Sequence, residues 1–416
     1  MRRKRSKIVT GLDIGTTKIV AITAQMAPDD PDQALTILGV GSTPSLGLKK
    51  GMVVDIDATV DSIRKAVNKS EEMSKIDVRE AYVGIAGGHI ESDNARGYIE
   101  VQNPSRGVTE GDRQRVLKRA QESIRAGEHL ELIHSIPQEF LLDGHGGITN
   151  PVGMSCSRLE ARVHLIYAAV TSASNILRCV TMAGLRPRDL MLESLASSLA
   201  LLSDHEKEVG VILIDVGGGT SDVAVFTDGS VRFSGVIPYG GDTITNDIAK
   251  CMKISRYDAE NVKKKYANAE STRVDADEEI ELTSLLKSTP ETASRRMLCE
   301  IVESRLEEIF LMARQMIEGS PVKYTSCAGV VLTGGTALME DIVHLAERVF
   351  ELPVKVGVPQ NLKGMSSGVS SPIYSTGIGL VLSGYENDLG TTHINTNGNV
   401  FHKVTDLFSR ILNWYS

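Results

Sequence analysis

The sequence predicts an α/β protein in which two related domains face each other across a cleft, with a further subdomain inserted in the first half. A strand, a tight turn and a second strand are expected near residue 13. The same plan returns near residue 215, each time with Asp-x-Gly at the turn. A third buried strand at 330–339 runs into another glycine turn. These repeats indicate two halves of common design.

The composition agrees with more than one domain. The chain has 416 residues, of which 41% are hydrophobic, so it can bury a sizeable core. Its net charge of -8 argues against a nucleic-acid-binding protein. No apolar stretch is long enough to predict a transmembrane helix or a secretory signal, so a cytosolic protein is expected. The five scattered cysteines lack metal-binding spacing and are expected to be free thiols.

One dense basic run stands at residues 1–7, Met-Arg-Arg-Lys-Arg-Ser-Lys. Such a run can contact anionic lipid, or it can be a solvated tail. The solvated tail is the favoured interpretation.

In the first half, residues 8–24 predict the first hairpin, because apolar and β-branched residues flank a polar tip. A helix is expected over 58–75 and a short buried strand over 81–86. Residues 87–160 are rich in Gly, Asn, Pro and charge, contain a predicted helix at 109–126, and indicate an inserted subdomain.

In the second half, residues 209–226 predict the matching hairpin, and helices are expected over 242–252 and 255–266. A long helix over 293–318 follows, since apolar residues recur there at 3.6-residue spacing. We therefore expect a first domain of residues 1–86, 161–204 and 366–385, and a second domain of 205–365 with a small subdomain at 242–324. A polar linker is expected at 386–399.

The two hairpin tips have the residues that a polyphosphate needs. Glycine lets backbone N–H groups approach phosphate oxygens, and hydroxyl groups add donors. The tips supply Gly15, Thr16, Thr17 and Lys18, and Gly217, Gly218, Gly219 and Thr220. Asp13 and Asp215 precede the glycines and are suited to hold Mg²⁺ through its water ligands. Asp215 can also orient a water for slow ATP hydrolysis, or it can serve purely as a magnesium anchor.

A single Asp-x-Gly-Thr turn is weak support, because Asp and Gly mark ordinary hairpins. The repeat and the third turn make the nucleotide interpretation the stronger one. The third turn, Gly334, Gly335, Thr336 and Ala337, lacks a carboxylate or lysine and is assigned to the adenosine.

Two further groups leave alternatives open. Gly240, Gly241 and Asp242 precede a helix whose N-terminus can favour phosphate, although Asp242 can equally be a plain N-cap. Glu260 and Lys263 share a helix face and can frame the base or ribose, or form a surface ion pair.

Residues 400–416 predict an amphipathic helix. On a helical wheel the apolar residues fall within one arc of about 160°, and the polar residues fall outside it. The segment is too short to span a bilayer but can lie in the membrane interface. The alternative is a terminal helix packed on its own domain, which the polar linker disfavours. The expected lipid contacts are Val404, Leu407, Phe408, Ile411, Leu412 and Trp414, with Lys403 and Arg410 at one edge.

The two hairpins and the glycine turn resemble the superfamily of actin, hexokinase and DnaK-type chaperones. Four stretches, 134–140, 147–153, 159–166 and 296–305, are similar to the FtsA family of bacterial cell-division proteins. The resemblance implies two RNase H-like domains that close over ATP and Mg²⁺, with the inserted subdomain at 87–160. The stretches at 134–140 and 147–153 read His-Ser-Ile-Pro-Gln-Glu-Phe and Gly-Ile-Thr-Asn-Pro-Val-Gly.

The resemblance also implies partners and a location. These are self-association into a polymer, binding of the FtsZ C-terminal peptide to the small subdomain, and recruitment of later division proteins. The tail would attach the protein peripherally to the inner membrane face at the division site. Sugar kinases of the superfamily need a catalytic base beside a sugar pocket, and no separate motif here marks one. Binding of ATP is therefore expected more than turnover, with a small-molecule kinase as the alternative.

Overall fold

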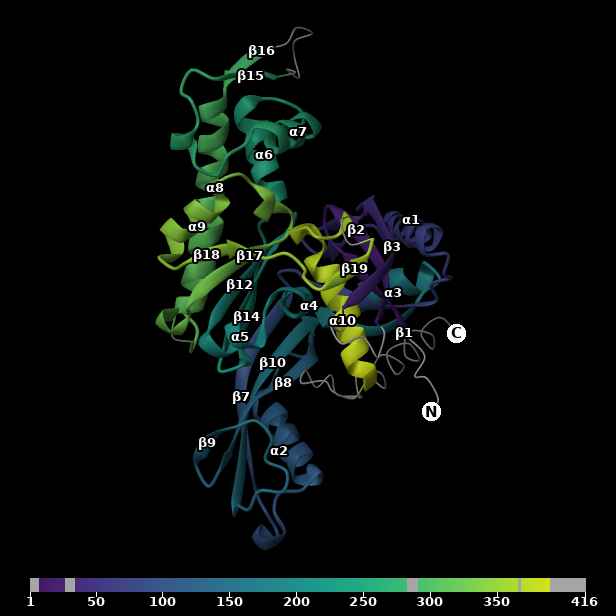
Figure 1. Cartoon of the computed structure of the whole chain (residues 1–416), viewed down its shortest axis with the longest axis vertical. Coiled ribbons are helices and arrows are strands. Elements are labelled where there is room, and N and C mark those ends of the chain that lie inside the picture. Colours follow the sequence, from purple (N-terminus) through teal and green to yellow (C-terminus); the bar gives the residue numbers. More distant parts are fainter. Residues whose placement is uncertain (1–6, 27–33, 283–290, 323, 366–367, 390–416) are drawn as a thin grey trace.

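The computed structural model describes residues 7–26, 34–282, 291–322, 324–365 and 368–389 (Figure 1). Two mixed sheets lie on either side of a cleft, and a third sheet projects away from both. This confirms the α/β fold of two related domains with an insertion in the first half. The predicted lipid contacts at 403–414 lie outside the described residues.

The sheet of the first domain has the order β11-β6-β1-β2-β3-β19. Its strands are β1 (Lys7–Ile14), β2 (Lys18–Met26), β3 (Leu35–Pro44), β6 (Glu80–Ile85), β11 (Arg186–Leu192) and β19 (Leu362–Gly364). A small ribbon of β4 (Leu48–Lys49) and β5 (Met52–Val53) follows β3. Helices α1 (Ile56–Ser74), α3 (Val170–Met182), α4 (Glu193–Leu201) and α10 (Ser375–Leu389) cover the sheet.

Alternation along β2 explains how two layers of helices pack on this sheet. Successive side chains of a strand point to opposite faces. Ile22 contacts Gly377 of α10, whereas the Thr23 hydroxyl hydrogen-bonds Ser70 of α1 at 3.0 Å. Both faces are therefore covered, which accounts for the nearly continuous burial of β1 and β2.

The sheet of the second domain repeats the hairpin plan in the order β14-β13-β12-β17-β18. The strands are β12 (Val211–Val216), β13 (Ser221–Thr227), β14 (Ser230–Ile237), β17 (Gly329–Thr333) and β18 (Val354–Val356). The helices are α5 (Asp204–Val209), α6 (Gly241–Met252), α7 (Arg256–Tyr266), α8 (Arg295–Glu318) and α9 (Ile342–Phe350), and β15 (Glu279–Leu282) pairs with β16 (Glu291–Ser294). The apolar stripe expected on α8 is buried, and Phe310 meets Phe350 with ring centroids 5.7 Å apart.

Local signals set several helix starts. Asp55 caps α1 by accepting from the Ala58 N–H, and Ser255 caps α7 by accepting from the Asp258 N–H at 3.0 Å. Thr109 and Asp112 form a capping box at the start of α2 (Glu110–Ser123). The long helix α8 begins at Arg295, slightly later than expected, because β16 takes up the preceding residues.

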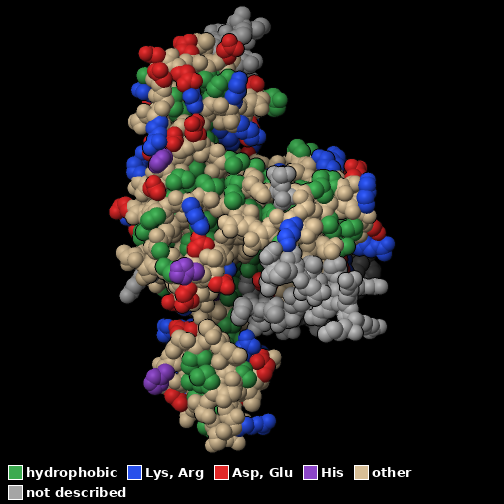
Figure 2. All heavy atoms as spheres, in the orientation of Figure 1, with side chains coloured by type: hydrophobic (Ala, Val, Ile, Leu, Met, Phe, Trp, Pro, Cys, Tyr) green, Lys and Arg blue, Asp and Glu red, His purple; other side chains and the backbone are tan. Residues whose placement is uncertain are grey.

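The inserted subdomain is a four-stranded sheet with the order β7-β10-β8-β9. Its strands are β7 (Ile90–Glu100), β8 (Leu130–Leu142), β9 (His145–Ile148) and β10 (Arg158–Ala169), and α2 packs on one face. Gly97 lets α2 approach closely, since a Cβ there would lie 2.3 Å from the Ala120 nitrogen. In Figure 2 this part of the chain projects from the rest of the molecule.

Three expected boundaries differ from the structure. Strand β10 continues to Ala169, so the inserted sheet extends past the boundary expected at residue 160. Strand β19 pairs with β3 of the first sheet, although residues 362–364 were assigned to the second domain. Helix α10 runs to Leu389, so the first residues of the expected linker are helical. Strand pairing and the extent of helix α10, which composition does not show, set these boundaries.

A polar seam joins the inserted sheet to β14 of the second domain. The His164 ring lies 2.8 Å from the Asn94 side-chain oxygen and 2.9 Å from the Ser234 hydroxyl. Gln138 donates to the same Asn94 oxygen and to the Val231 carbonyl. These directional hydrogen bonds hold the inserted sheet to the second domain, although its sequence is inserted in the first domain.

Candidate nucleotide-binding cleft

The two glycine turns meet tip to tip between the domains. A Cβ on Gly218 would lie 2.3 Å from a Thr17 methyl, and a Cβ on Gly219 would lie 2.3 Å from the Thr16 hydroxyl oxygen. Only glycine permits this approach, because such contacts are shorter than real Cβ atoms allow. The repeat seen in the sequence therefore forms one site.

The turns border a cavity of about 640 Å³. Its walls include most of the residues predicted for nucleotide and metal: Asp13, Gly15, Thr16, Thr17, Lys18, Asp215, Gly217, Gly218, Gly219, Thr220, Gly241, Asp242, Glu260, Lys263, Gly334, Gly335 and Thr336. Gly240 and Ala337 are not among them. Gly240 packs behind the second turn, against the carbonyl oxygens of residues 217–220, and Ala337 is buried under the third turn.

Helix α6 braces the second turn from behind. The Gly241 and Asp242 N–H groups donate to the carbonyl oxygens of Gly217 and Gly218, at 2.9 and 2.8 Å. Gly240 occupies the N-cap position, and the Asp242 carboxylate pairs with Arg256 at 2.8 Å. The plain N-cap alternative for Asp242 is therefore wrong. These first N–H groups of α6 hold the turn in place instead of pointing freely into the cavity.

The third turn is locked to the second. Its Thr336 hydroxyl donates to the Gly217 carbonyl at 3.2 Å, and Gly334 adopts a left-handed φ of 87°. A Cβ on Gly334 would lie 2.4 Å from an Asp215 carboxylate oxygen, so glycine is required here by both space and backbone.

Glu260 and Lys263 form an ion pair at 2.7 Å that is part of the cavity wall. Lys263 also donates to the Gly241 carbonyl at 2.9 Å, which ties α7 to the start of α6. Burial alone would raise the pKa of Glu260, but Lys263 and the hydrogen bonds from Lys263 and Thr245 lower it to about 2. The ion pair is therefore confirmed and borders the cavity, and its contact with the base or ribose stays a prediction.

Carboxylates gather beneath the two turns. Asp215 and Asp222 are directly opposite each other on β12 and β13, Asp13 lies on β1, and Glu193 begins α4. Burial, with Asp215 as a lesser cause, raises the pKa of Asp13 to about 6 against the opposing effect of Lys18. Burial likewise raises the pKa of Asp215, and raises those of Asp222 and Glu193 well above their ordinary values. The site therefore holds more potential negative charge than Lys18 neutralises.

The residues fit a hydrated cation. Asp215 Oδ2 accepts from the Ser197 and Thr376 hydroxyls at 2.8 and 3.2 Å, which fixes its orientation. One oxygen of Asp222, Oδ1, is buried without a hydrogen-bond partner. An orphaned carboxylate oxygen beside two further carboxylates matches the donor set that Mg²⁺ prefers. Within the described ranges no group of three or more His, Cys, Asp or Glu side chains is arranged to hold a metal ion directly.

Lys18 is engaged with the wall of the cleft. Its ammonium donates to the Ile373 carbonyl at 2.7 Å and lies over the Tyr374 ring. Burial lowers the Lys18 pKa, opposed by Asp13 and Asp215. Lys18 still borders the cavity, and an ammonium group has three donors.

Sequence reasoning missed Glu193 and Asp222. Asp222 follows Thr220 closely in the same hairpin and could have been found as the strand position opposite Asp215. Glu193 had no such signal, because only the parallel pairing of β11 with β6 brings the start of α4 to the cleft.

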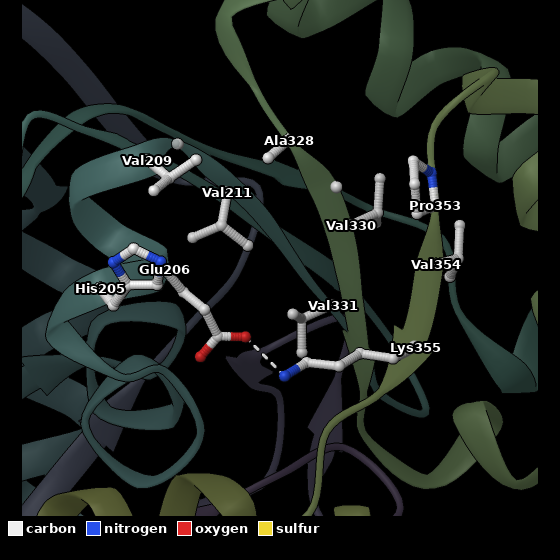
Figure 3. Close-up of a pocket in the computed structure, with 12 residues that line it drawn as sticks. His205, Glu206, Val209, Val211, Ala328, Val330, Val331, Pro353, Val354 and Lys355 are labelled. Atoms are coloured by element: carbon white, nitrogen blue, oxygen red, sulfur yellow. Dashed lines mark hydrogen bonds and ion pairs between the residues drawn. The ribbon is translucent and has the colours of Figure 1, made fainter.

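A second, smaller cavity of about 330 Å³ lies at the opposite ends of β12 and β17 (Figure 3). Its walls are mainly valines, and the Glu206–Lys355 ion pair crosses its rim. It has no glycine-rich turn or carboxylate cluster. In open α/β sheets ligands bind at the carboxyl ends of parallel strands, which is where the larger cavity lies.

Comparison with known proteins identifies the family. The family model "Cell division protein FtsA" matches residues 212–379, and "SHS2 domain inserted in FTSA" matches residues 87–167. The cell division protein FtsA of Pseudomonas aeruginosa is 42% identical over 91% of this chain and 90% of that protein. This chain belongs to the FtsA family. The Escherichia coli K12 FtsA protein is 36% identical over 96% of this chain and 94% of that protein.

Solved structures agree on the actin-like fold. A PilM–PilN type IV pilus biogenesis complex matches with a TM-score of 0.64 at 15% identity, covering 90% of this chain and 98% of that one. MreB5 of Spiroplasma citri bound to AMPPNP matches with a TM-score of 0.51 at 16% identity, covering 93% and 99%. The predicted fold class and the resemblance to FtsA are both confirmed.

Proposed function

We propose that this FtsA-family chain is an ATP- and Mg²⁺-binding cell-division adaptor that self-associates and tethers FtsZ to the cytoplasmic face of the inner membrane. The observation that carries the proposal is the contact between two glycine turns over a carboxylate cluster in one cavity. The AMPPNP in the MreB5 structure supports an adenine nucleotide as the ligand.

The lining of the cavity suits both parts of ATP. The turns at 15–18 and 217–220 supply backbone and hydroxyl donors for phosphates. Gly335, Thr336 and the Glu260–Lys263 pair border the same cavity and would contact the adenosine. Asp13, Asp215 and Asp222 would hold hydrated Mg²⁺, which when bound neutralises phosphate charge.

Slow hydrolysis would depend on Glu193 more than on Asp215. Two hydroxyl groups donate to Asp215 Oδ2 and fix its orientation, which suits an anchoring role. Glu193 borders the same cavity and is suited to orient a water and accept its proton. The carboxylate form of Glu193 is favoured when cationic charge lies nearby.

Family membership supports the partners. The FtsZ C-terminal peptide would bind the small subdomain at 242–324, and the inserted subdomain offers a separate surface for later division proteins. Among the described residues no helix is long and apolar enough to cross a bilayer. Attachment would come from the amphipathic segment at 400–416, at the division site.

Vesicle flotation tests the proposal. Anionic vesicles are mixed with the full chain, with or without ATP and Mg²⁺, and with a labelled FtsZ C-terminal peptide. We expect the chain and the peptide to float together, and self-association to increase with ATP.

The tail is tested by the triple variant L407E/F408E/W414E, which should not float. The matched control, H402D/S409D/N413D, places the same number of acidic residues on the polar arc and should retain most of the binding. Normal flotation of the first variant would refute the tail assignment. ADP production that depends on a small-molecule substrate and is unchanged in both triple variants would instead establish the kinase alternative.

A further inference from the structure

We infer that His134 of the inserted subdomain is a positioning residue for ATP hydrolysis, because its ring holds the start of α4 and thereby Glu193. The inference rests on the proposed function, in which Glu193 orients a water. The two residues are far apart in the sequence, and only the fold brings the inserted sheet to this end of α4.

One hydrogen bond makes the connection. The Leu192 N–H donates to His134 Nε2 at 3.0 Å, and Leu192 directly precedes Glu193, the first residue of α4. Leu192 ends β11, the edge strand of the first sheet, and the inserted subdomain supplies a partner at this edge. Both side chains are buried, with His134 only 1% exposed. Water therefore does not replace this acceptor.

The His134 ring is kept for this one contact. A backbone N–H can only donate, so Nε2 accepts and the proton of the neutral ring lies on Nδ1. Nδ1 is buried without a hydrogen-bond partner in the part of the chain that the structure describes. Burial lowers the pKa of His134 to about 4, so the ring stays neutral near pH 7 and remains an acceptor.

Two irregularities in β8 direct its side chains to the two domains. The pairing of β8 with β10 shifts register twice, once beside His134 and once beside Gln138. Such bulges re-aim side chains and are common next to active sites. Gln138 donates to the Val231 carbonyl of the second domain at 3.0 Å, whereas His134 holds Leu192 of the first. In Figure 1, β8 and β10 run from the projecting part of the inserted sheet toward α4. A displacement of this sheet would therefore reach the start of α4.

Helix α4 carries that position into the cleft. The Glu193 side chain borders the cavity and packs closely on β6, since a Cβ on Gly84 would lie 3.2 Å from Glu193 Cγ. One turn later, Ser197 donates to Asp215 at 2.8 Å. The start of α4 thus sets the place of one cleft carboxylate directly and supports the orientation of another.

Loss of the acceptor should change the rate and leave ATP affinity nearly unchanged. A buried N–H without a partner is unfavourable, so the start of α4 would shift toward another acceptor. Misplacement of a reacting group by about 1 Å can cost about a hundredfold in rate. His134 itself does not border the nucleotide cavity, so the contacts that bind ATP stay in place.

The experiment measures phosphate release by the full chain with Mg²⁺, under single-turnover conditions with protein in excess of ATP. His134→Leu removes the acceptor but keeps a side chain in the space, whereas His134→Gln keeps an acceptor. We expect H134L to slow hydrolysis roughly ten- to a hundredfold. H134Q should stay within about threefold of the unchanged chain, and the Kd for ATP should change by less than about threefold in both variants.

His164→Leu is the matched control. His164 lies on the neighbouring strand β10 and is also 1% exposed, but it hydrogen-bonds Asn94 and Ser234 and makes no contact of this kind with β11. Its loss should lower the melting temperature about as much as H134L does, while hydrolysis stays within about threefold. An equal loss of rate in H164L would refute the inference, because the rate would then follow general loosening of the inserted sheet.

Two further measurements test the route from His134 to Glu193. The double variant E193Q/H134L should hydrolyse ATP at the rate of E193Q alone, and a further loss would show that His134 does not act through Glu193. Amide hydrogen exchange over residues 190–196 should be faster in H134L but not in H134Q or H164L. Unchanged exchange in H134L would also count against the inference, and this readout does not depend on turnover.

The outcomes separate this inference from the proposed function. Normal hydrolysis in H134L, together with a loss in E193Q, would overturn the positioning role of His134 and leave the role of Glu193 intact. Normal hydrolysis in E193Q would instead overturn the proposed role of Glu193, and with it this inference.

Discussion

The contact between the two turns predicts a large effect of Gly219→Ala on ATP binding. The new Cβ would lie 2.3 Å from the Thr16 hydroxyl oxygen and 2.7 Å from the Thr16 Cβ, whereas ordinary contacts begin near 3.4 Å. Rotation of the Thr16 side chain cannot remove the second overlap, because Cβ is fixed by the backbone. The tips must separate by about 1 Å.

A displacement of this size takes an N–H···O distance of about 2.9 Å beyond hydrogen-bonding range. Loss of one hydrogen bond to a charged phosphate costs about 1.5–3 kcal/mol. We therefore expect the Kd for ATP with Mg²⁺ to rise roughly ten- to 150-fold. Isothermal titration calorimetry measures this directly.

Two variants control the interpretation. Gly368→Ala places a Cβ at an exposed site with nothing within 4 Å, so its ATP affinity should not change. In the double variant G219A/T16G the overlapping Cβ is gone, and part of the lost affinity should return. Unchanged affinity in G219A alone would refute the argument that the two tips must touch.

Three further predictions concern the carboxylates and a buried histidine. Asp222→Asn replaces a buried carboxyl group whose Oδ1 has no hydrogen-bond partner. Without Mg²⁺ the melting temperature should rise by a few degrees, at about 2–4 °C per kcal/mol of added stability. Mg²⁺-dependent ATP binding should weaken. Scanning calorimetry without Mg²⁺ and with Mg²⁺ and ATP should therefore show a gain and a loss of stability, respectively. Glu193→Gln should lower the rate of ATP hydrolysis, measured by phosphate release, at least tenfold. The Kd for ATP, measured by titration, should change by less than about threefold. A loss of affinity equal to the loss of rate would contradict the assigned role. Burial lowers the pKa of His134 to about 4, so the unfolded chain takes up a proton below its ordinary value near 6.5 and the folded chain does not. The free energy of unfolding, measured with urea, should fall by up to about 3 kcal/mol as pH falls from 7 to 4. His134→Gln keeps an acceptor for the Leu192 N–H and should reduce this pH dependence. An unchanged pH dependence in the variant would contradict the prediction.

Much of the cleft could be predicted because its parts are local. A hairpin tip with Asp-x-Gly is defined by a few adjacent residues, and the repeat of this motif predicts a second hairpin of the same design. The amphipathic stripe of α8 and the caps at Thr109 and Ser255 are likewise set by neighbours in sequence. Periodicity and capping therefore placed these elements to within a few residues.

Contacts made across the fold could not be predicted in this way. Glu193 reaches the cleft only because β11 pairs with β6, and β19 joins the first sheet only through β3. Both depend on strand pairing between segments far apart in the chain. The linker expected to begin at residue 386 begins later, since α10 runs to Leu389.

By itself, then, the sequence determined that two glycine turns and an inserted subdomain exist, since each is written in residue type and spacing. The tertiary structure alone decided what these parts do together. It set the turns tip to tip, added Asp222 and Glu193 beneath them, and fixed Leu192 beside His134. The physical reason is that close approach and shared burial are properties of pairs of distant residues, which no single stretch of the chain encodes.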